Sequence, residues 1–595
     1  MPPRAASPRA GRFDARPSRS GVGRRRAPGH RRAVLSLIAV AVACACTRAP
    51  AQSLASMPER KARHAQREFE MLRRALLPRV PARGDGCDVT IGDICYWDDN
   101  ADSPLPVERP RVALARRQLR SSLDSLGAID SASDYIAGQR VRYAVEAGDA
   151  AGAARALAHC AATPWWCAAL RAFAWHRAGE EAASSAAFDT ALAEMPDTLR
   201  CQWLDVHDWL PQGTHLEPAR DPRSCDARAA TSERVFWLAA PLLTWRPVAA
   251  RNEFFSRRTL TKMLAGTANA QYSFWRWDSE TTALRYGWPD QWAREDTPIG
   301  AAEFPDPRII GDEPRPSFSL VPDPHALESP FAANPGDWRL TEDRAAVMRY
   351  APGWLRMIDT LPVQIARFRR PGDSMLVVAV YDAGVLLDSG STAFVAAASL
   401  SSGLGPDSTL AIGRTRGAPT GDIVLDAPAR AALASVEVFD SVGHRAARWR
   451  AGLAPLPASA AISDLLVGRA GAAFAPATPD SAARVAMPTL RVTARDTLAL
   501  YWESYLRPPP GVPVRTTVRL TKAAGFFGRV GRAFGLGRAQ AGPAVSWEDA
   551  QPEATMAHFL RFGVADLPPG HYRIDVTVQA PHAHGTASRD IDVVD

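Results

Sequence analysis

The chain has 595 residues, 46% of them hydrophobic and 23% charged, which is typical of a folded protein of several domains and excludes global disorder. The formal net charge of +8 is misleading, because residues 1–51 hold eleven arginines and one acid, Asp14, a net charge of +10. The remainder carries −2, so we expect no nucleic-acid partner. No lysine follows a glycine, which excludes a Walker A phosphate loop.

The first 51 residues have the order of an export signal. A basic stretch at 24–32 precedes an apolar run of 14 residues at 33–46 and an Ala-x-Ala site that ends at Ala51. The run is shorter than the roughly 20 residues that span a bilayer. We predict a signal peptide at 1–51 and a mature chain that is periplasmic, outer-membrane-associated or secreted. Arg31-Arg32 leaves a twin-arginine signal open, and Cys44 and Cys46 leave lipidation open.

The remaining six cysteines predict disulfides, because an even number in an exported chain is typical of a disulfide framework. Near-neighbour pairing is the hypothesis, although six cysteines allow 15 connectivities. A zinc site is disfavoured because no Cys-x-x-Cys pair occurs. The expected pairs are Cys87–Cys95, Cys160–Cys167 and Cys201–Cys225.

Residues 52–106 are predicted to form a helix followed by a disulfide-closed loop, and residues 107–230 a helical domain. Phe69, Leu72 and Leu76 give the first helix one apolar stripe. Two similar units follow, at 135–160 and 166–196, and the second resembles a tetratricopeptide repeat through Trp175, Gly179, Phe188, Ala191, Leu192 and Pro196. That resemblance implies stacked antiparallel helix pairs, and a stack of plain helical hairpins is the alternative.

Tryptophan is dense in the first part of the chain, where 14 of the 17 lie before residue 355. An aromatic groove for peptides or sugars is one interpretation. A tryptophan-rich core is the favoured one, because large aromatic side chains are mostly buried in folded proteins.

Residues 231–295 carry a pattern of Asn-Glu, then Trp-x-x-Asp, then a short strand at Leu284-Arg285-Tyr286, then Gly-x-Pro-Asp. In this order and spacing the segment resembles a divergent GWxTD domain of exported bacterial proteins, a family without an established activity. The resemblance therefore implies a place in the cell envelope and a structural role for the signature. The signature residues are Asn252, Glu253, Trp275, Asp278, Gly287, Pro289 and Asp290.

The rest of the chain is predicted to be β-rich. Ten prolines at 289–335 indicate a linker or an extended wrap, taken here as a Pro-rich linker at 296–344. Alternating strands such as 497–502, 514–520 and 571–579 predict antiparallel, Ig-like sandwiches at 345–475 and 485–595. The fold class is thus α+β multidomain, a TPR-like α-helical region followed by antiparallel β-sandwich domains.

A search for chemistry in the sequence finds no catalytic, cofactor-binding or metal-binding motif. Ser374 in Gly-Asp-Ser fits a hairpin turn better than a hydrolase nucleophile, and His582 and His584 have no third ligand nearby. Residues 521–540 are basic, aromatic and glycine-rich, which suits a mobile loop or, alternatively, peripheral contact with anionic lipid.

The sequence therefore predicts an exported, non-enzymatic scaffold or protein-interaction protein of the bacterial cell envelope, without a cofactor. Its expected partner is an envelope protein or peptide. The alternative is an envelope hydrolase, or a glycan-binding or glycan-active protein, with a site in the tryptophan-rich helical half. That alternative predicts a deep pocket with paired, perturbed carboxylates.

Overall fold

The computed structural model describes most of the chain after residue 54. The described residues are 55–81, 89–91, 94–97, 106–211, 214, 216, 224–271, 277–289, 291–296, 309–312, 319–340, 352–384, 393–470, 475–522, 543–549 and 554–594. The predicted signal peptide, Cys87, Trp275, Asp290 and nearly all of 521–540 lie outside them, and of Cys95 and Asp278 only the backbone is described. Within these ranges no helix has the length and apolar character needed to cross a membrane.

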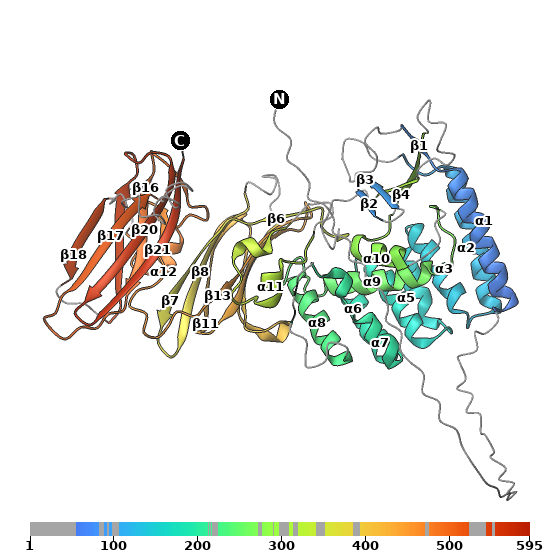
Figure 1. Cartoon of the computed structure of the whole chain (residues 1–595), viewed down its shortest axis with the longest axis horizontal. Helices are drawn as coiled ribbons and strands as arrows, with labels where there is room; N and C mark the ends of the chain where they lie inside the picture. Colours follow the sequence, from blue (N-terminus) through green and yellow to red (C-terminus); the bar gives the residue numbers. More distant parts are fainter. Residues whose placement is uncertain are drawn as a thin grey trace, which may run out of the picture. The chain divides into compact units, whose positions relative to one another are not determined.

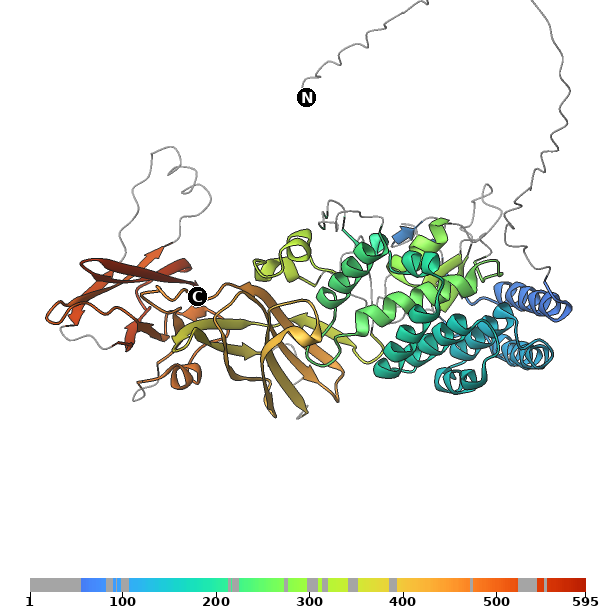
Figure 2. The ribbon, with the colours of Figure 1, turned by 90° about the horizontal axis from the view of Figure 1, so that it is seen from below.

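The α+β class is confirmed at the level of a helical N-terminal region followed by a β-rich half (Figure 1). Helices α5, α6 and α9 lie against one another (Figures 1 and 2). The helices of this region are α1 (Met57–Ala75), α2 (Pro110–Ile129), α3 (Asp134–Glu146), α4 (Ala150–Ala156), α5 (Pro164–Arg177), α6 (Glu181–Glu194), α7 (Asp197–Trp203), α8 (Cys225–Leu238), α9 (Ala249–Leu264) and α10 (Trp277–Tyr286).

Two helical hairpins, α3–α4 and α5–α6, turn at equivalent glycines. Gly148 has φ 81° and Gly179 has φ 83°, a left-handed conformation that glycine adopts without the steric cost of a Cβ. The two similar units recognised in the sequence are therefore two helix pairs that end and restart in the same way.

Aromatic side chains fill the centre of the helical region. Trp209, Phe254 and Phe255 are fully buried, and the rings of Trp209 and Phe254 meet edge to face at 4.9 Å. Trp165, Trp166 and Trp203 are at most 8% exposed. These tryptophans are core residues, in agreement with the interpretation that the sequence favours.

Two disulfides join neighbouring parts of the helical region. The structure links Cys160 to Cys167 and Cys201 to Cys225, which are two of the three pairs expected from near-neighbour spacing. The third pair, Cys87–Cys95, lies outside the residues whose side chains are described. Two disulfides are consistent with an exported chain, because such bonds persist in oxidising compartments.

A small sheet beside these helices corrects the expectation of a linker at 296–344. Its strand order is β1-β4-β5-β3-β2, so β5 of the Pro-rich range lies in the middle. From the same range, Leu320 and Leu327 are fully buried in the helical core. The prolines thus shape an extended wrap. The strands are β1 (Arg79–Val80), β2 (Val89–Ile91), β3 (Ile94–Trp97), β4 (Gln291–Glu295) and β5 (Ile309–Asp312), and the wrap adds α11 (Pro324–Glu328) and a short 3-10 helix, η3 (Pro335–Trp338).

The prediction of a short strand at Leu284-Arg285-Tyr286 is wrong, because these residues form the last turn of α10. Ala283 and Leu284 are both 1% exposed, so adjacent residues rather than alternate ones are buried. The Gly287 N–H donates to the Ala283 carbonyl at 3.1 Å and closes the last helical turn. The strand follows later, as β4.

The β-rich half begins with two sheets that share one core, in which Val377, Val436 and Ala398 are buried. All neighbouring strands are antiparallel except β6, which runs parallel to β13. Ser374 donates to the Pro371 carbonyl at 2.8 Å in the β7–β8 turn, as the hairpin interpretation has it. The sheets are β10 (Thr409–Arg416), β9 (Phe394–Ser401), β12 (Ala432–Asp440), β13 (Arg445–Leu453) and β6 (Met357–Thr360), and β11 (Thr420–Pro428), β8 (Ser374–Asp382) and β7 (Val363–Arg370).

A second pair of sheets follows the same plan. Leu498, Leu500 and Trp502 are fully buried on one face of β16, as their alternation predicts. Strand β14 belongs here although it lies within 345–475, and β15 pairs with β21 in parallel. The sheets are β14 (Leu466–Arg469), β16 (Thr497–Ser504) and β19 (Met556–Gly563), and β15 (Arg491–Thr493), β21 (Ala583–Val594), β20 (Gly570–Ala580), β17 (Val514–Lys522) and β18 (Ala544–Asp549), with α12 (Pro479–Ala483) between β14 and β15.

A fully buried charge cluster, which we call the clamp (Glu437, Arg448 and Arg450), attaches the α8–α9 loop to β12 and β13. Arg450 donates to the Leu238 carbonyl at 3.0 Å and to the Ala240 carbonyl at 2.8 Å. Arg448 also donates to the Ala240 carbonyl, at 2.7 Å. Glu437 accepts from the Leu243 N–H at 2.7 Å and lies 3.3 Å from Arg450. The clamp therefore ties the helical region to the first sheet pair.

Candidate functional site

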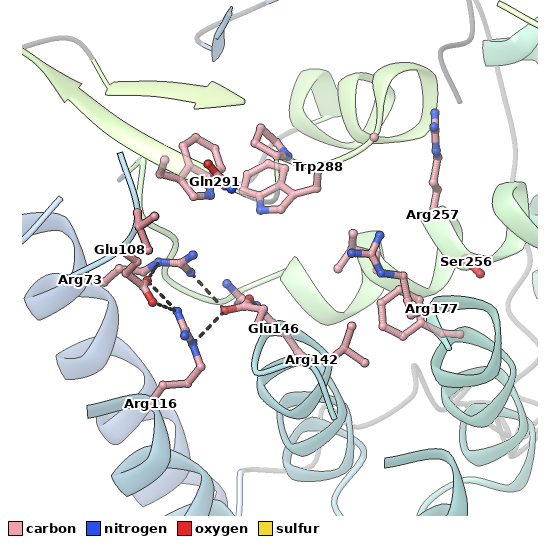
Figure 3. Close-up of a pocket in the computed structure, with 18 of the residues that line it drawn as sticks. Arg73, Glu108, Arg116, Arg142, Glu146, Arg177, Ser256, Arg257, Trp288 and Gln291 are labelled. Carbon is pink, nitrogen blue, oxygen red and sulfur yellow. Dashed lines mark hydrogen bonds and ion pairs between the residues drawn. The ribbon is translucent and has the colours of Figure 1, made fainter. Parts of the chain in front are cut away.

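A pocket of about 480 Å³ opens in the helical region, which is within the usual size range of ligand sites. It is bounded by α1, α2, α3, α5 and α9 and by the turn that joins α10 to β4 (Figure 3). Its charged lining comprises five arginines and three glutamates: Arg73, Arg116, Arg142, Arg177, Arg257, Glu108, Glu146 and Glu253.

One wall of the pocket is a network of ion pairs between α1, α2 and α3 (Figure 3). Arg116 donates to both carboxylate oxygens of Glu108, at 2.6 and 2.7 Å. Arg73 lies 3.3 Å from Glu108 and donates to Glu146 at 3.2 Å. Burial would raise the pKa of Glu146, but Arg73, Arg142 and Arg116 outweigh burial and lower it. Glu146 is therefore ionised at neutral pH.

Behind this wall lies a second carboxylate in a different state. Glu70 is 1% exposed, accepts from the Tyr143 hydroxyl at 2.7 Å and pairs with Arg142 at 3.0 Å. Burial raises the pKa of Glu70, and the arginines Arg142 and Arg73 offset only part of that rise. Glu70 stabilises the wall from within and does not line the pocket.

The Asn-Glu pair of the family-like signature holds the opposite side. Asn252 donates to the Glu181 carbonyl at 2.9 Å and is fully buried. Glu253 accepts from His176 at 2.9 Å and from Arg257, while His176 also lies 3.2 Å from Glu181. Burial would lower the pKa of His176, but Glu181 and Glu253 raise it to about 9, so this histidine is a cation at neutral pH.

Arg257 connects the two halves of the signature. It donates to the carbonyls of Leu284 and Arg285, at 2.9 and 2.8 Å, and so caps the end of α10. Gly287 then turns the chain with φ 81°. A side chain on Gly311 of β5 would lie 2.4 Å from Pro289, so these two residues pack closely. The Asn-Glu helix and the Gly-x-Pro turn therefore form one unit, and the turn brings Trp288 to the pocket.

Two of the three glutamates that line the pocket, Glu146 and Glu253, are held in the ionised form. Burial opposes the ionisation of Glu253, yet Arg257 and His176 lower its pKa well below the ordinary value. A general acid needs a carboxyl with a raised pKa, and neither Glu146 nor Glu253 has one. The pocket has an excess of cationic side chains, and Ser256, which is 3% exposed, lines it with an Oγ that has no hydrogen-bond partner among the described residues.

The structure brings together four of the seven signature residues, because Glu253, Gly287 and Pro289 line the pocket and Asn252 lies next to them. Asp278 belongs to α10, while Trp275 and Asp290 lie outside the described residues. Sequence reasoning missed Arg73, Glu108, Arg116 and Glu146. One usable signal was a charged residue on the apolar face of a predicted helix. Arg116 lies between Val112 and Leu119 on such a face and is 8% exposed.

No group of histidine, cysteine and acidic side chains in the described part of the chain is arranged to hold a metal ion. His582 and His584 are both exposed in the β20–β21 hairpin. A different pair, unforeseen in the sequence, joins the Ser504 Oγ to Nε2 of His558 at 2.9 Å. Its side chains are 4% and 7% exposed, and His558 stacks on the fully buried Trp502, so the pair belongs to the protein interior.

Comparisons with known proteins leave the family of this chain open. No protein-family model and no curated protein matches the sequence. Among solved structures it is similar to the receptor tyrosine kinase Torso (7% identity, 39% of this chain and 75% of that chain, TM-score 0.12). It is also similar to Escherichia coli alpha-2-macroglobulin activated by porcine elastase (10%, 41% and 22%, 0.13) and to the FN1–FN3 domains of chicken CNTN1 (11%, 39% and 66%, 0.12). TM-scores this low carry no inference about function.

Proposed function

We propose that this chain is an exported, non-enzymatic binding protein of a bacterial cell envelope, whose helical region holds a partner protein at the arginine-lined pocket. In this proposal the α3–α4 and α5–α6 hairpins are TPR-like repeats, and the two sheet pairs are Ig-like sandwiches that support them. The export pattern at 1–51 and the two disulfides favour the compartment.

The single observation that carries the proposal is the state of the pocket's carboxylates. Glu146 and Glu253 both have lowered pKa values, because arginines and a cationic histidine surround them. A pocket of this kind offers strong, directional hydrogen-bond donors to a ligand, and neither of these two carboxyls is suited to donate a proton. The alternative of a glycan-active hydrolase agrees with the presence of a pocket, but its general acid would be a carboxyl of raised pKa that faces the pocket.

Site-specific photo-crosslinking in intact cells of the source bacterium tests the proposal. A photoreactive amino acid replaces Val107, which is 88% exposed and lines the pocket. The matched control position is Val545 on β18, which is 56% exposed and remote in sequence. We expect one envelope protein to crosslink from position 107 and not from position 545. Equal yields from both positions, or no adduct from either, would refute the proposal.

A hydrolase assay provides the complementary test. The purified chain is offered peptidoglycan, ester and peptide substrates, and we expect no turnover above that of a Glu146→Gln, Glu253→Gln double variant. Turnover that disappears in the double variant would show that the pocket is an active site.

A further inference from the structure

Among the glutamates that line the pocket, Glu108 differs from the others in the kind of segment that carries it. Glu108 lies in the irregular residues that precede α2, next to Val107, which is 88% exposed. Its side chain is 28% exposed, whereas those of Arg73 and Arg116, which hold it, are 8% and 10% exposed. The arginines come from packed helices, and the glutamate comes from an exposed segment. The cations are therefore fixed in place, and Glu108 is the more readily replaced partner.

The two arginines depend on Glu108 to different degrees. Arg73 also pairs with Glu146 at 3.2 Å and lies 3.8 Å from Glu70. Arg116 keeps only a longer contact with Glu146, at 3.7 Å, when Glu108 is discounted. Removal of Glu108 would leave Arg116 as a cation that faces the pocket without a close carboxylate. Such a fork of N–H donors matches an incoming carboxylate.

The pocket also offers an apolar surface, on the side formed by the turn between α10 and β4 (Figure 3). Trp288 and Trp292 lie with ring centroids 5.3 Å apart, and Leu77 lines the same side. The partnerless Oγ of Ser256 supplies a further hydrogen-bonding group in the lining. Together these groups suit a ligand that has a carboxylate and an adjoining apolar group.

We propose that the pocket binds an acidic peptide segment of the partner, in which a glutamate or aspartate carboxylate takes the place of Glu108 on Arg116 and a neighbouring apolar side chain packs against Trp288 and Trp292. Glu108 then acts as an internal competitor that occupies the anion subsite in the free protein. This inference rests on the proposed function and names the chemistry of its ligand.

A carboxylate fits this subsite better than a phosphate. Exchange of one carboxylate for another leaves the charge beside Glu146 unchanged. A phosphate monoester brings up to two negative charges next to that ionised glutamate. The subsite also already holds a carboxylate, Glu108, with both oxygens in contact with one guanidinium.

The experiment measures binding of a fluorescein-labelled peptide, in which glutamates flank a leucine, to the full chain by fluorescence anisotropy. The matched peptide has glutamines in place of the glutamates. Free glutamate and inorganic phosphate are added as competitors, so that a small carboxylate or a phosphate ligand is distinguished from a peptide. Glu108→Ala and Arg116→Leu are the test variants. Glu548→Ala and Arg515→Leu are the controls, because Arg515 also donates twice to its glutamate, at 3.0 and 2.6 Å, on an exposed sheet face.

We expect the acidic peptide to bind and the glutamine peptide to bind about tenfold more weakly. We also expect the Glu108→Ala variant to bind the acidic peptide about tenfold more tightly, because the variant has lost the competing charge-assisted contact. Arg116→Leu abolishes binding and both controls leave it unchanged. Because Glu108→Ala is a gain of binding, it remains decisive if Arg116→Leu misfolds.

Equal binding of both peptides, or unchanged affinity in Glu108→Ala, would overturn the inference. Displacement of the labelled peptide by free glutamate or by phosphate at equal concentration would assign the subsite to that small ligand and overturn it as well. A crosslinked partner at position 107 together with either result would keep the proposed function and reject only the acidic peptide as its ligand.

Discussion

Two clusters of arginines and glutamates among the described residues differ in the partners that they bind. In the clamp, Arg448 and Arg450 donate to backbone carbonyls of the α8–α9 loop, and Glu437 accepts backbone N–H groups of the same loop. At the pocket, Arg73 and Arg116 pair with side-chain carboxylates. Backbone groups in a packed loop cannot be exchanged for a ligand, whereas side-chain carboxylates at an opening can. The same residue types therefore hold two parts of the chain together in one place and, in our proposal, bind a ligand in the other.

The largest expected effect is the loss of a charge from the clamp. Glu437→Ala removes a 0% exposed carboxylate and leaves Arg450 buried without it. Burial already lowers the pKa of Arg450, a tendency that Glu437 opposes. Breaking a buried pair from one side costs about 3–5 kcal/mol, so we expect a loss of that size in the free energy of unfolding, measured by urea denaturation.

The matched change at the pocket is Glu108→Ala, whose side chain is 28% exposed and whose partner Arg73 keeps Glu146. We expect a loss of less than about 1 kcal/mol for this variant. Similar losses for Glu437→Ala and Glu108→Ala would show that the two clusters do not differ as described.

His176 gives the next effect, which depends on pH. Its pKa rises to about 9 in the folded chain from an ordinary value near 6.5, because Glu181 and Glu253 outweigh burial. The stabilisation is therefore fully present below about pH 6.5 and is lost as the pH rises through about 9, with a total of about 3 kcal/mol. We expect the free energy of unfolding to fall between pH 7 and 9.5 in the parent chain and to stay nearly level in His176→Gln. Parallel curves for the two chains would contradict this assignment.

Alternation along strands made the β-rich half predictable from the sequence. Tyr572, Ile574 and Val576 face the core of the second sheet pair, as their period-two spacing indicates. The pairing of the strands could not be predicted from the sequence, because alternation shows which face of a strand is buried but not which other strand lies beside it. Strand β14, for example, pairs with β16, although Leu466 and its partner Tyr501 are 35 positions apart in the sequence.

The pocket could be predicted only in part. Asn252, Glu253, Gly287 and Pro289 stood out as a pattern, yet their spacing gave no sign that Arg257 joins them through the end of α10. Arg73 and Arg116 come from two other helices, and their pairing with Glu108 depends on how α1 and α2 pack. The position of Arg116 on an apolar stripe marks it as unusual, but nothing in the local sequence shows which carboxylate it pairs with.

A smaller effect separates the signature turn from an ordinary helical turn. Gly287→Ala and Gly179→Ala both place a side chain at positive φ, 81° and 83° respectively. Each is expected to cost about 1 kcal/mol of stability, measured by thermal unfolding. Only Gly287→Ala should also weaken binding of the acidic peptide, because that turn positions Trp288 at the pocket. Equal affinities for the two variants would mean that the turn has no role in the site.

The smallest effect is expected on the outer face of β17, where Arg515 pairs with Glu548. Their side chains are 62% and 47% exposed, so water and salt screen the pair on both sides. Arg515→Ala should change the free energy of unfolding by less than about 0.5 kcal/mol, and 1 M salt should remove the difference from the parent chain. Urea denaturation at low and high salt measures both quantities. If Arg515→Ala lowered the free energy of unfolding nearly as much as Glu437→Ala does, the comparison would fail. The strength of an arginine contact in this protein would then depend on its side-chain hydrogen bonds, not on burial and backbone partners.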